Sequence, residues 1–140
     1  MLLLIIALLI MAIIVLVFHS NNSYVGTYNY DDQYTITLKQ DGTCDFAERG
    51  ESFYSDGKLK CNYKVENETI HFNRDVIDFY FAHDGTTSKG QGVGSNFTCA
   101  QYEGKYSTDN CKETIISIQE SAAIGETGMI YKDKTYTKLK

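Results

Sequence analysis

Two patterns of apolar and polar residues divide the chain. From Leu2 to Phe18 every side chain is apolar, and the polar segment 19–23 follows abruptly. A helix of these 17 residues, at a rise of about 1.5 Å per residue, is roughly 25 Å long, the short end of what crosses a bilayer. This pattern predicts a transmembrane anchor over residues 1–18, a linker over 19–23 and a separate domain over 24–140.

The domain over 24–140 has the second pattern, in which apolar and polar residues alternate with the period of two typical of half-buried strands. The clearest example is 58–65, where every second side chain is apolar and the others are lysine or asparagine. Glycine-rich residues 84–96 are typical of a long flexible loop, and residues 121–125 are the strongest helical candidate, at one turn. The alternation predicts about nine short strands, over residues 34–39, 43–48, 58–65, 69–73, 76–82, 97–102, 114–119, 128–132 and 134–139.

The composition also favours strands. The chain has 11 Tyr and 7 Phe but no Pro and no Trp, and aromatic residues are enriched in β-sheets. We therefore expect an all-β domain, a small antiparallel meander β-barrel of about 8–9 strands behind the transmembrane helix. Aromatic residues on the predicted inward faces fill the barrel core or line a cavity for a small apolar ligand. They are Tyr34, Phe46, Tyr63, Phe72, Phe79, Phe81 and Phe97.

The charged residues bear on partners and on topology. All 13 basic and 18 acidic residues follow residue 23, and the net charge of −5 argues against nucleic acid as a partner. Asp31 and Asp32 precede the first lysine, Lys39, so the amino terminus is expected inside and the domain outside the cytoplasm. Residues 17–20 offer no clean pair of small residues for signal peptidase. We therefore expect an uncleaved, single-pass anchor.

Four cysteines, Cys44, Cys61, Cys99 and Cys111, lie in the exported domain and form neither a C-x-x-C pair nor a zinc framework. Two disulfides are the expected use of four cysteines in an exported domain of this size. Three pairings are open, and consecutive pairing is favoured because each pair then joins neighbouring elements of a meander. A Cys44–Cys99 bridge has the separation that immunoglobulin-like sandwiches use. Four reduced, buried thiols are the remaining alternative.

Four short motifs follow one another between residues 26 and 72. They are Gly-Thr-Tyr at 26–28, Tyr-Thr-Ile-Thr-Leu at 34–38, Asp-Gly-Thr-Cys-Asp-Phe at 41–46, and a Tyr-Lys-Val to Ile-His-Phe hairpin at 63–72. This order resembles the opening of small bacterial lipocalin-like domains, which are often tethered behind a membrane segment or a lipidated cysteine. The chain departs from that family in having Tyr28 where Trp is typical, and four cysteines where most members have none. The resemblance implies an up-and-down β-barrel with a possible apolar interior, and it implies no particular ligand.

The sequence offers no evident catalytic constellation. His19 lies at the membrane boundary, His71 lies on the outer face of its strand, and His83 precedes a turn. The acidic pairs within 31–32 and 48–51 lack the spacing of a calcium loop and are typical of turns. Nucleophile-elbow, zinc-protease and phosphate-loop motifs are absent from the sequence. We therefore expect no enzymatic activity, no metal and no cofactor.

These expectations combine into one leading function and one alternative. The leading hypothesis is a membrane-tethered extracytoplasmic domain that binds a small apolar ligand or a surface protein. The alternative is an immunoglobulin-like β-sandwich with an adhesive or immune-modulating role. Asn-x-Ser/Thr triplets at Asn21, Asn67 and Asn96 are glycosylation acceptors only in a eukaryotic or viral host.

Overall fold

The protein was analysed in a computed structural model that describes residues 5–13, 23–83, 86–93, 99 and 111–140. Residues 5–13 form a helix, and no helix among the described residues has the length and hydropathy to cross a bilayer. The rest of the predicted anchor, residues 1–4 and 14–18, lies outside the described residues. The strands are β1 (Gly26–Tyr30), β2 (Tyr34–Leu38), β3 (Cys44–Glu48), β4 (Glu51–Ser52), β5 (Cys61–Glu66), β6 (Thr69–His83), β7 (Thr86–Gly92), β8 (Lys112–Ile124), β9 (Gly128–Tyr131) and β10 (Lys134–Lys138).

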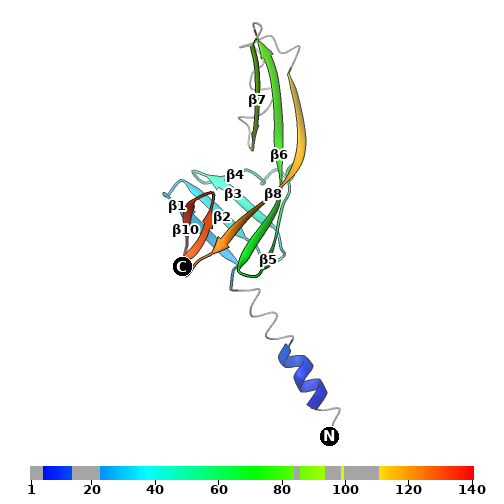
Figure 1. The fold of residues 1–140 in the computed structure, drawn as a ribbon, viewed down its shortest axis with the longest axis vertical. Coiled ribbons are helices and arrows are strands. Elements are labelled where there is room, and N and C mark those ends of the chain that lie inside the picture. Colours follow the sequence, from blue (N-terminus) through cyan, green and yellow to red (C-terminus); the bar gives the residue numbers. More distant parts are fainter. Residues whose placement is uncertain (1–4, 14–22, 84–85, 94–98, 100–110) are drawn as a thin grey trace.

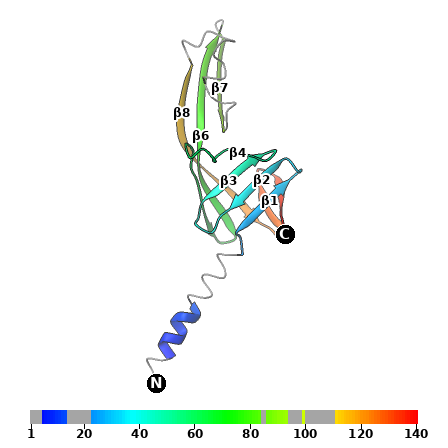
Figure 2. The same cartoon turned by 180° about the vertical axis from the view of Figure 1, so that it is seen from behind.

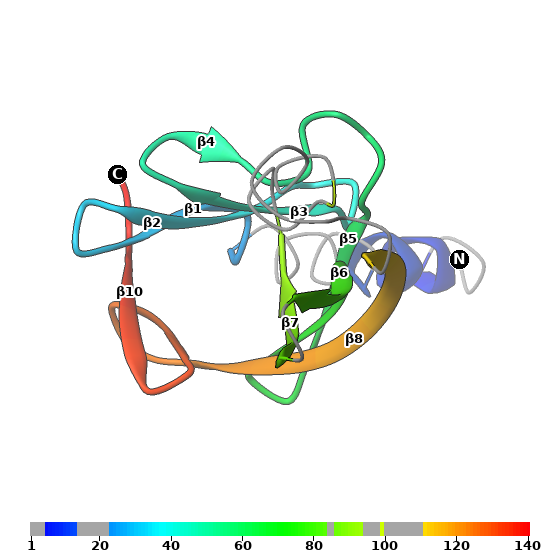
Figure 3. The same ribbon diagram turned by 90° about the horizontal axis from the view of Figure 1, so that it is seen from above.

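These strands form one antiparallel sheet, which confirms the all-β prediction. The 10-stranded sheet has the order β4-β3-β2-β1-β10-β9-β8-β6-β5, and β7 pairs with β6 away from this path. Strands that are neighbours in the sequence are mostly neighbours in the sheet. The pairing of β1 with β10 joins strands β1–β4 to strands β5–β10. Seen along the long axis, the sheet curves round until β3 comes near β5 (Figure 3).

A closed barrel, the predicted form of this sheet, is not found. The ladder ends at β4 and at β5, and β3 and β5 are joined through one isolated bridge between Thr43 and Asn62. The Cys44–Cys61 disulfide crosses the same gap, with a Cα–Cα distance of 5.0 Å. The two edges therefore meet at one point rather than along a continuous ladder.

Both disulfides join consecutive cysteines, which confirms the favoured pairing. Cys44 is bonded to Cys61 and Cys99 to Cys111, and no cysteine in the described chain is free. The Cys44–Cys99 bridge expected for an immunoglobulin-like sandwich is thus not formed. Four reduced thiols, the other alternative, are also excluded in this structure.

Four of the hairpin turns use two residues with positive φ. This backbone is the type I′ turn, whose twist matches the right-handed twist of the strands that it joins. The predicted turn function of the acidic pair at 31–32 is confirmed by φ values of 54° and 49°. The turn residues are Asp31 and Asp32, Arg49 and Gly50, Asn67 and Glu68, and Lys132 and Asp133.

Several element boundaries differ from the prediction because distant strands decide them. The segments 69–73 and 76–82, predicted as two strands, form the single 15-residue strand β6. Residues 86–92, predicted as part of a loop, form β7, in which Gly90 and Gly92 lie opposite Phe79 and Ile77. The predicted helical turn at 121–125 is wrong because β8 continues to Ile124 along β6. The strand predicted over 97–102 lies, apart from Cys99, outside the described residues.

The long strand β6 changes its buried face part of the way along. Ile70, Phe72 and Val76 are buried at even positions, whereas further on the buried residue is Phe79, at an odd position. Because side chains alternate between the faces of a strand, Val76 and Phe79 lie on opposite faces. Phe79 is 7% exposed but is not part of the main core cluster.

This change of face separates two regions. The extension consists of residues 77–83 of β6, strand β7 and residues 112–115 of β8, and it projects from the rest of the molecule (Figures 1 and 2). The wrapped sheet comprises the remaining strands and strand segments. It encloses the core cluster of Tyr28, Ile36, Leu38, Cys44, Phe46, Cys61, Ile70, Phe72, Ala122, Met129, Tyr131 and Tyr136.

Candidate functional site

The aromatic residues that the sequence predicts as a ligand-lining set come from β2, β3, β5 and β6, apart from Phe97. Phe46 and Phe72 come together in the core, with ring centroids 5.2 Å apart. Tyr131, which the sequence analysis did not select, packs edge-on against both rings at 5.6 and 5.7 Å. Tyr34 and Tyr63 are half-buried against this cluster. The rings that the structure brings together therefore occupy one another's contact surfaces.

The remaining members of the predicted set are not in this cluster. Phe79 lies in the extension, on the face of β6 opposite to that of Phe72. The side chain of Phe81 and the whole of Phe97 fall outside the described part of the structure. The predicted lining is thus divided between two regions of the molecule.

A buried arginine lies beside the aromatic cluster. Arg74, 8% exposed, extends from β6 over the ring of Phe46, with its guanidinium carbon 4.9 Å from the ring centroid. Its Nε donates to Glu120 Oε2 on β8 at 2.5 Å. Its Nη1 and Nη2 donate to the hydroxyls of Tyr54 and Tyr131, each at 3.3 Å. Each nitrogen of the guanidinium group therefore has a partner inside the protein.

Glu120 is equally well partnered. Its Oε2 also accepts a hydrogen bond from the Tyr131 hydroxyl at 2.5 Å, and Lys132 Nζ lies 2.7 Å from its Oε1. Burial opposes ionisation of this carboxyl, but the bonds from Arg74, Lys132 and Tyr131 outweigh burial and hold its pKa at about 2. Burial, together with the bond to Glu120, raises the pKa of the Tyr131 hydroxyl well above its ordinary value.

These shifts decide what the buried cluster can do chemically. A carboxylate with such a low pKa is a weak proton acceptor near neutral pH, and a phenol with a raised pKa is a weak proton donor and nucleophile. The hydrogen bonds to Glu120 and Tyr54 also raise the pKa of the Arg74 guanidinium despite its burial, so Arg74 stays charged. The cluster is therefore suited to holding β6, β8 and β9 together, and poorly suited to acid–base catalysis.

The sequence analysis did not identify Arg74 or Glu120. A usable signal existed, because Arg74 continues the buried even-numbered positions Ile70 and Phe72. An inward charge on a strand needs a charged partner, since an unpaired buried ion is costly. That signal is visible only when β6 is taken as one strand through residue 74, and the prediction ended the strand at 73.

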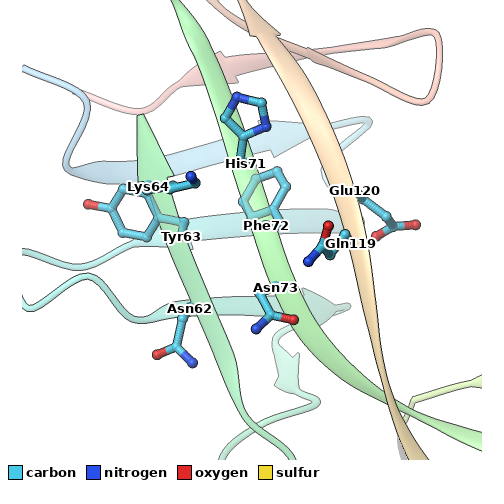
Figure 4. A pocket seen from close by; sticks show the side chains of 8 residues that line it. All are labelled: Asn62, Tyr63, Lys64, His71, Phe72, Asn73, Gln119 and Glu120. Atoms are coloured by element: carbon cyan, nitrogen blue, oxygen red, sulfur yellow. The ribbon is translucent and has the colours of Figure 1, made fainter. Parts of the chain in front are cut away.

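The outer face of the same strands has a shallow, open pocket of about 430 Å³ (Figure 4). Asn62, Asn73 and Gln119 form a transverse row, since Asn73 lies directly opposite both of the others. Lys64 and His71 form the next row, and His71 is on the outer face, as predicted. The residues lining the pocket are Asn62, Tyr63, Lys64, His71, Phe72, Asn73, Gln119 and Glu120.

The polar groups of this pocket are mostly uncommitted. Lys64 Nζ forms an ion pair of 2.9 Å with Glu66 Oε1, so the surface is close to neutral. The carboxamides of Asn62, Asn73 and Gln119 offer both hydrogen-bond donors and acceptors to solvent. Across the described residues, no group of three or more His, Cys, Asp or Glu side chains is arranged to hold a metal ion. The outer face is therefore a neutral hydrogen-bonding surface.

Comparisons with family models, with curated proteins and with solved structures find no match to this chain. The lipocalin-like resemblance of residues 26–72 stays a prediction.

Proposed function

We propose that this chain is a membrane-tethered, extracytoplasmic, non-enzymatic binding domain whose partner is a protein. The apolar run 2–18 supports the tether, since its length and composition suit a membrane span. The two disulfides support an oxidising compartment outside the cytoplasm. In this proposal the wrapped sheet is a lipocalin-like meander barrel, and the Cys44–Cys61 disulfide serves as the closure between β3 and β5.

One observation favours a protein partner over an apolar ligand inside the sheet. The rings of Phe46, Phe72 and Tyr131 pack against one another, and the charged Arg74 lies over Phe46. A small apolar ligand would have to displace these contacts and approach a buried charge. Binding on the outside of the sheet requires neither change.

A second feature is the position of the extension relative to the proposed membrane anchor. Figure 1 places the extension at the end of the molecule opposite to the helix over 5–13. If that end is anchored in a membrane, the extension and the edge of β8 lie at the end farthest from the bilayer. This is the position that a partner approaching from outside would meet first.

The test starts from the full chain expressed through a secretory pathway. The proposal expects the protein in the membrane fraction, resistant to alkaline carbonate, with its domain accessible to added protease on the outer side. It also expects a photoactivatable apolar probe to label residues 2–18 and not the wrapped sheet, as mapped by mass spectrometry of the digested protein. Release by carbonate would contradict the tether, and labelling of Phe46, Phe72 or Tyr131 would contradict the choice of a protein partner.

A further inference from the structure

The direction of the main-chain groups in β8 follows from hydrogen bonds at its neighbour β6. The Asp75 N–H donates to the Lys60 carbonyl at 2.8 Å, so Asp75 points its main-chain groups away from β8. Main-chain groups alternate in direction along a strand, so the N–H and C=O groups of even-numbered residues of β6 point towards β8. The Ile124 N–H donates to the Glu68 carbonyl at 2.9 Å, which agrees. Even-numbered residues of β8 therefore bond to β6, and odd-numbered residues point to its other edge.

That other edge of β8 is open for most of its length. The next strand, β9, pairs with β8 only at Ala123 and Ile124. Among the described residues, the Cys99 N–H donates to the side chain of Glu113 at 2.8 Å, and no hydrogen bond to the main-chain groups of residues 113–121 comes from that side. An edge with unpaired N–H and C=O groups is a template for another strand. The residues whose main-chain groups point to this edge have exposed side chains; they are Glu113, Ile115, Ser117, Gln119 and Ser121.

We propose that two copies of this chain pair head to head through these edges, as antiparallel β8 strands related by a two-fold axis at Ile115. In this register Ile115 lies opposite its own copy, and Glu113 lies opposite Ser117 of the second copy. Ile115 is 54% exposed, so the pairing covers an exposed large apolar side chain of β8. Neighbouring registers place Ile115 opposite Glu113, Ser117 or Gln119, and centring the axis on Glu113 would bring two carboxylates together. A two-fold axis makes the contact self-limiting at two copies.

The strand direction fixes the arrangement of the two copies. The helix over 5–13, the wrapped sheet and the extension follow one another along the long axis of the molecule (Figures 1 and 2). Antiparallel β8 strands therefore overlap the two extensions and place the two helices at opposite ends of the dimer. On the proposed membrane tether, the two copies belong to two facing membranes, and the pairing joins them.

The size of the contact predicts a weak individual bond. The surface area that pairing of residues 113–117 would bury is well below the roughly 1,000 Å² of a stable interface. Each chain also carries a net charge of −5, although screening over about 8 Å at physiological salt limits the repulsion. Many weak contacts between two membranes act together, so low single-pair affinity is compatible with firm attachment.

Cysteine cross-linking of the full chain in detergent tests the register. In a hydrogen-bonded antiparallel pair the Cα atoms are about 5.5 Å apart, a distance that a disulfide spans. The Ile115→Cys variant should form a cross-linked dimer under mild oxidation. The matched control is Ile130→Cys, an isoleucine of similar exposure, 48%, on β9, which should stay monomeric. Equal cross-linking of both variants, or of neither, overturns the proposal. The open edge of β8 would then be a binding site for an extended peptide of another protein.

A proline substitution tests the hydrogen bonds themselves. The Ser117 N–H points to the open edge, so Ser117→Pro removes no main-chain hydrogen bond to β6 and should leave the fold intact. It should weaken dimerisation by about tenfold, or roughly 1.4 kcal/mol. Because the Ser117 hydroxyl also donates to Asp75 Oδ1 at 2.6 Å, Ser117→Ala is the control that loses this bond but keeps the N–H. Equal dimerisation of the Pro and Ala variants overturns the proposal.

Experiments with vesicles distinguish a failure of the joining of two membranes from a failure of the proposed membrane tether, on which this inference rests. Phosphatidylcholine vesicles carrying the full chain should cluster, as measured by light scattering, and those carrying Ser117→Pro should not. Dimers in detergent without clustering of protein-loaded vesicles would overturn the joining of two membranes. Failure of the full chain to float with vesicles would instead contradict the membrane tether, while the detergent cross-links still decide the strand pairing.

Discussion

The wrapped sheet and the extension share the strands β6 and β8 but differ in what their apolar residues do. In the wrapped sheet, β6 lies between β5 and β8, and its buried side chains meet aromatic rings from across the core. In the extension, β6 lies between β7 and β8, and Ile115 on β8 is exposed. The buried face of β6 changes between Val76 and Phe79. The same pair of strands thus packs into the core along one half and carries an exposed isoleucine along the other.

The two regions also differ in how they treat charge. Arg74 and Glu120 are buried in the wrapped sheet with a full set of partners. In the extension, Lys89 is exposed and lies 5.9 Å from the centre of the Tyr80 ring. A buried pair is costly to break because the remaining charge loses its compensation, whereas an exposed contact is replaced by water.

Truncating a core ring should have the largest effect. Phe72→Ala removes a fully buried ring that contacts Phe46 and Tyr131, and should lower the free energy of unfolding by about 3–5 kcal/mol. Ile115→Ala in the extension should change it by less than about 0.5 kcal/mol. Chemical denaturation of the full chain in detergent measures both. Comparable losses would mean that the extension belongs to the same packed core.

Breaking the buried ion pair should come next. Arg74→Met leaves Glu120 buried without its main partner and should cost about 3 kcal/mol. Adding Glu120→Gln should restore part of that loss because the uncompensated charge is removed. Lys89→Met in the extension is the control and should change stability by less than about 0.5 kcal/mol. A double variant less stable than the single one would show that Glu120 stabilises the fold independently of Arg74.

The two disulfides should differ in their effect on the core. Replacing Cys44 and Cys61 by serine removes the covalent link between the two edges of the wrapped sheet. It should lower the free energy of unfolding by about 3 kcal/mol, given the sequence separation of 17. Replacing Cys99 and Cys111 should mainly make the chain near the extension more sensitive to protease, with little shift of the main unfolding midpoint. Equal midpoint shifts would indicate that the extension and the wrapped sheet unfold as one unit.

Acid should produce the smallest of these effects, again confined to the wrapped sheet. The pKa of Glu120 is lowered from 4.5 to about 2, so this group stabilises the folded state above pH 4.5. That contribution should be lost as the pH falls from about 4.5 to 2, because the unfolded chain takes up the proton first. Glu120→Gln should flatten this part of the curve of stability against pH. An identical curve for the Glu120→Gln variant and the unchanged chain would contradict the assignment.

The local sequence was sufficient for features that depend on neighbouring residues. Alternation over 58–65 correctly placed Leu59 and Cys61 inside and the lysines outside. The acidic pair at 31–32 was correctly assigned to a turn. The favoured consecutive pairing of the cysteines was also correct, although Cys44–Cys61 joins the two edges of the sheet rather than neighbouring strands of the ladder.

The prediction was wrong where a distant strand decides the local structure. Residues 86–92 and 121–124 are strands because β6 offers them a hydrogen-bonding edge, although their composition favours a loop and a helical turn. The change of face in β6 also set Phe79 apart from the other described members of the candidate lining set, which a strand ended at residue 73 could not reveal.

By itself, the sequence indicated the apolar amino-terminal segment, the all-β class, the turn at 31–32 and the favoured one of three cysteine pairings, because each depends on residue type and short spacing. Only the tertiary structure decided that the sheet edges meet at a single bridge, that Arg74 and Glu120 pair across 46 residues, and that β8 leaves an open edge. These features depend on which strands lie side by side, and the pairing of strands remote in sequence is not encoded in any local pattern.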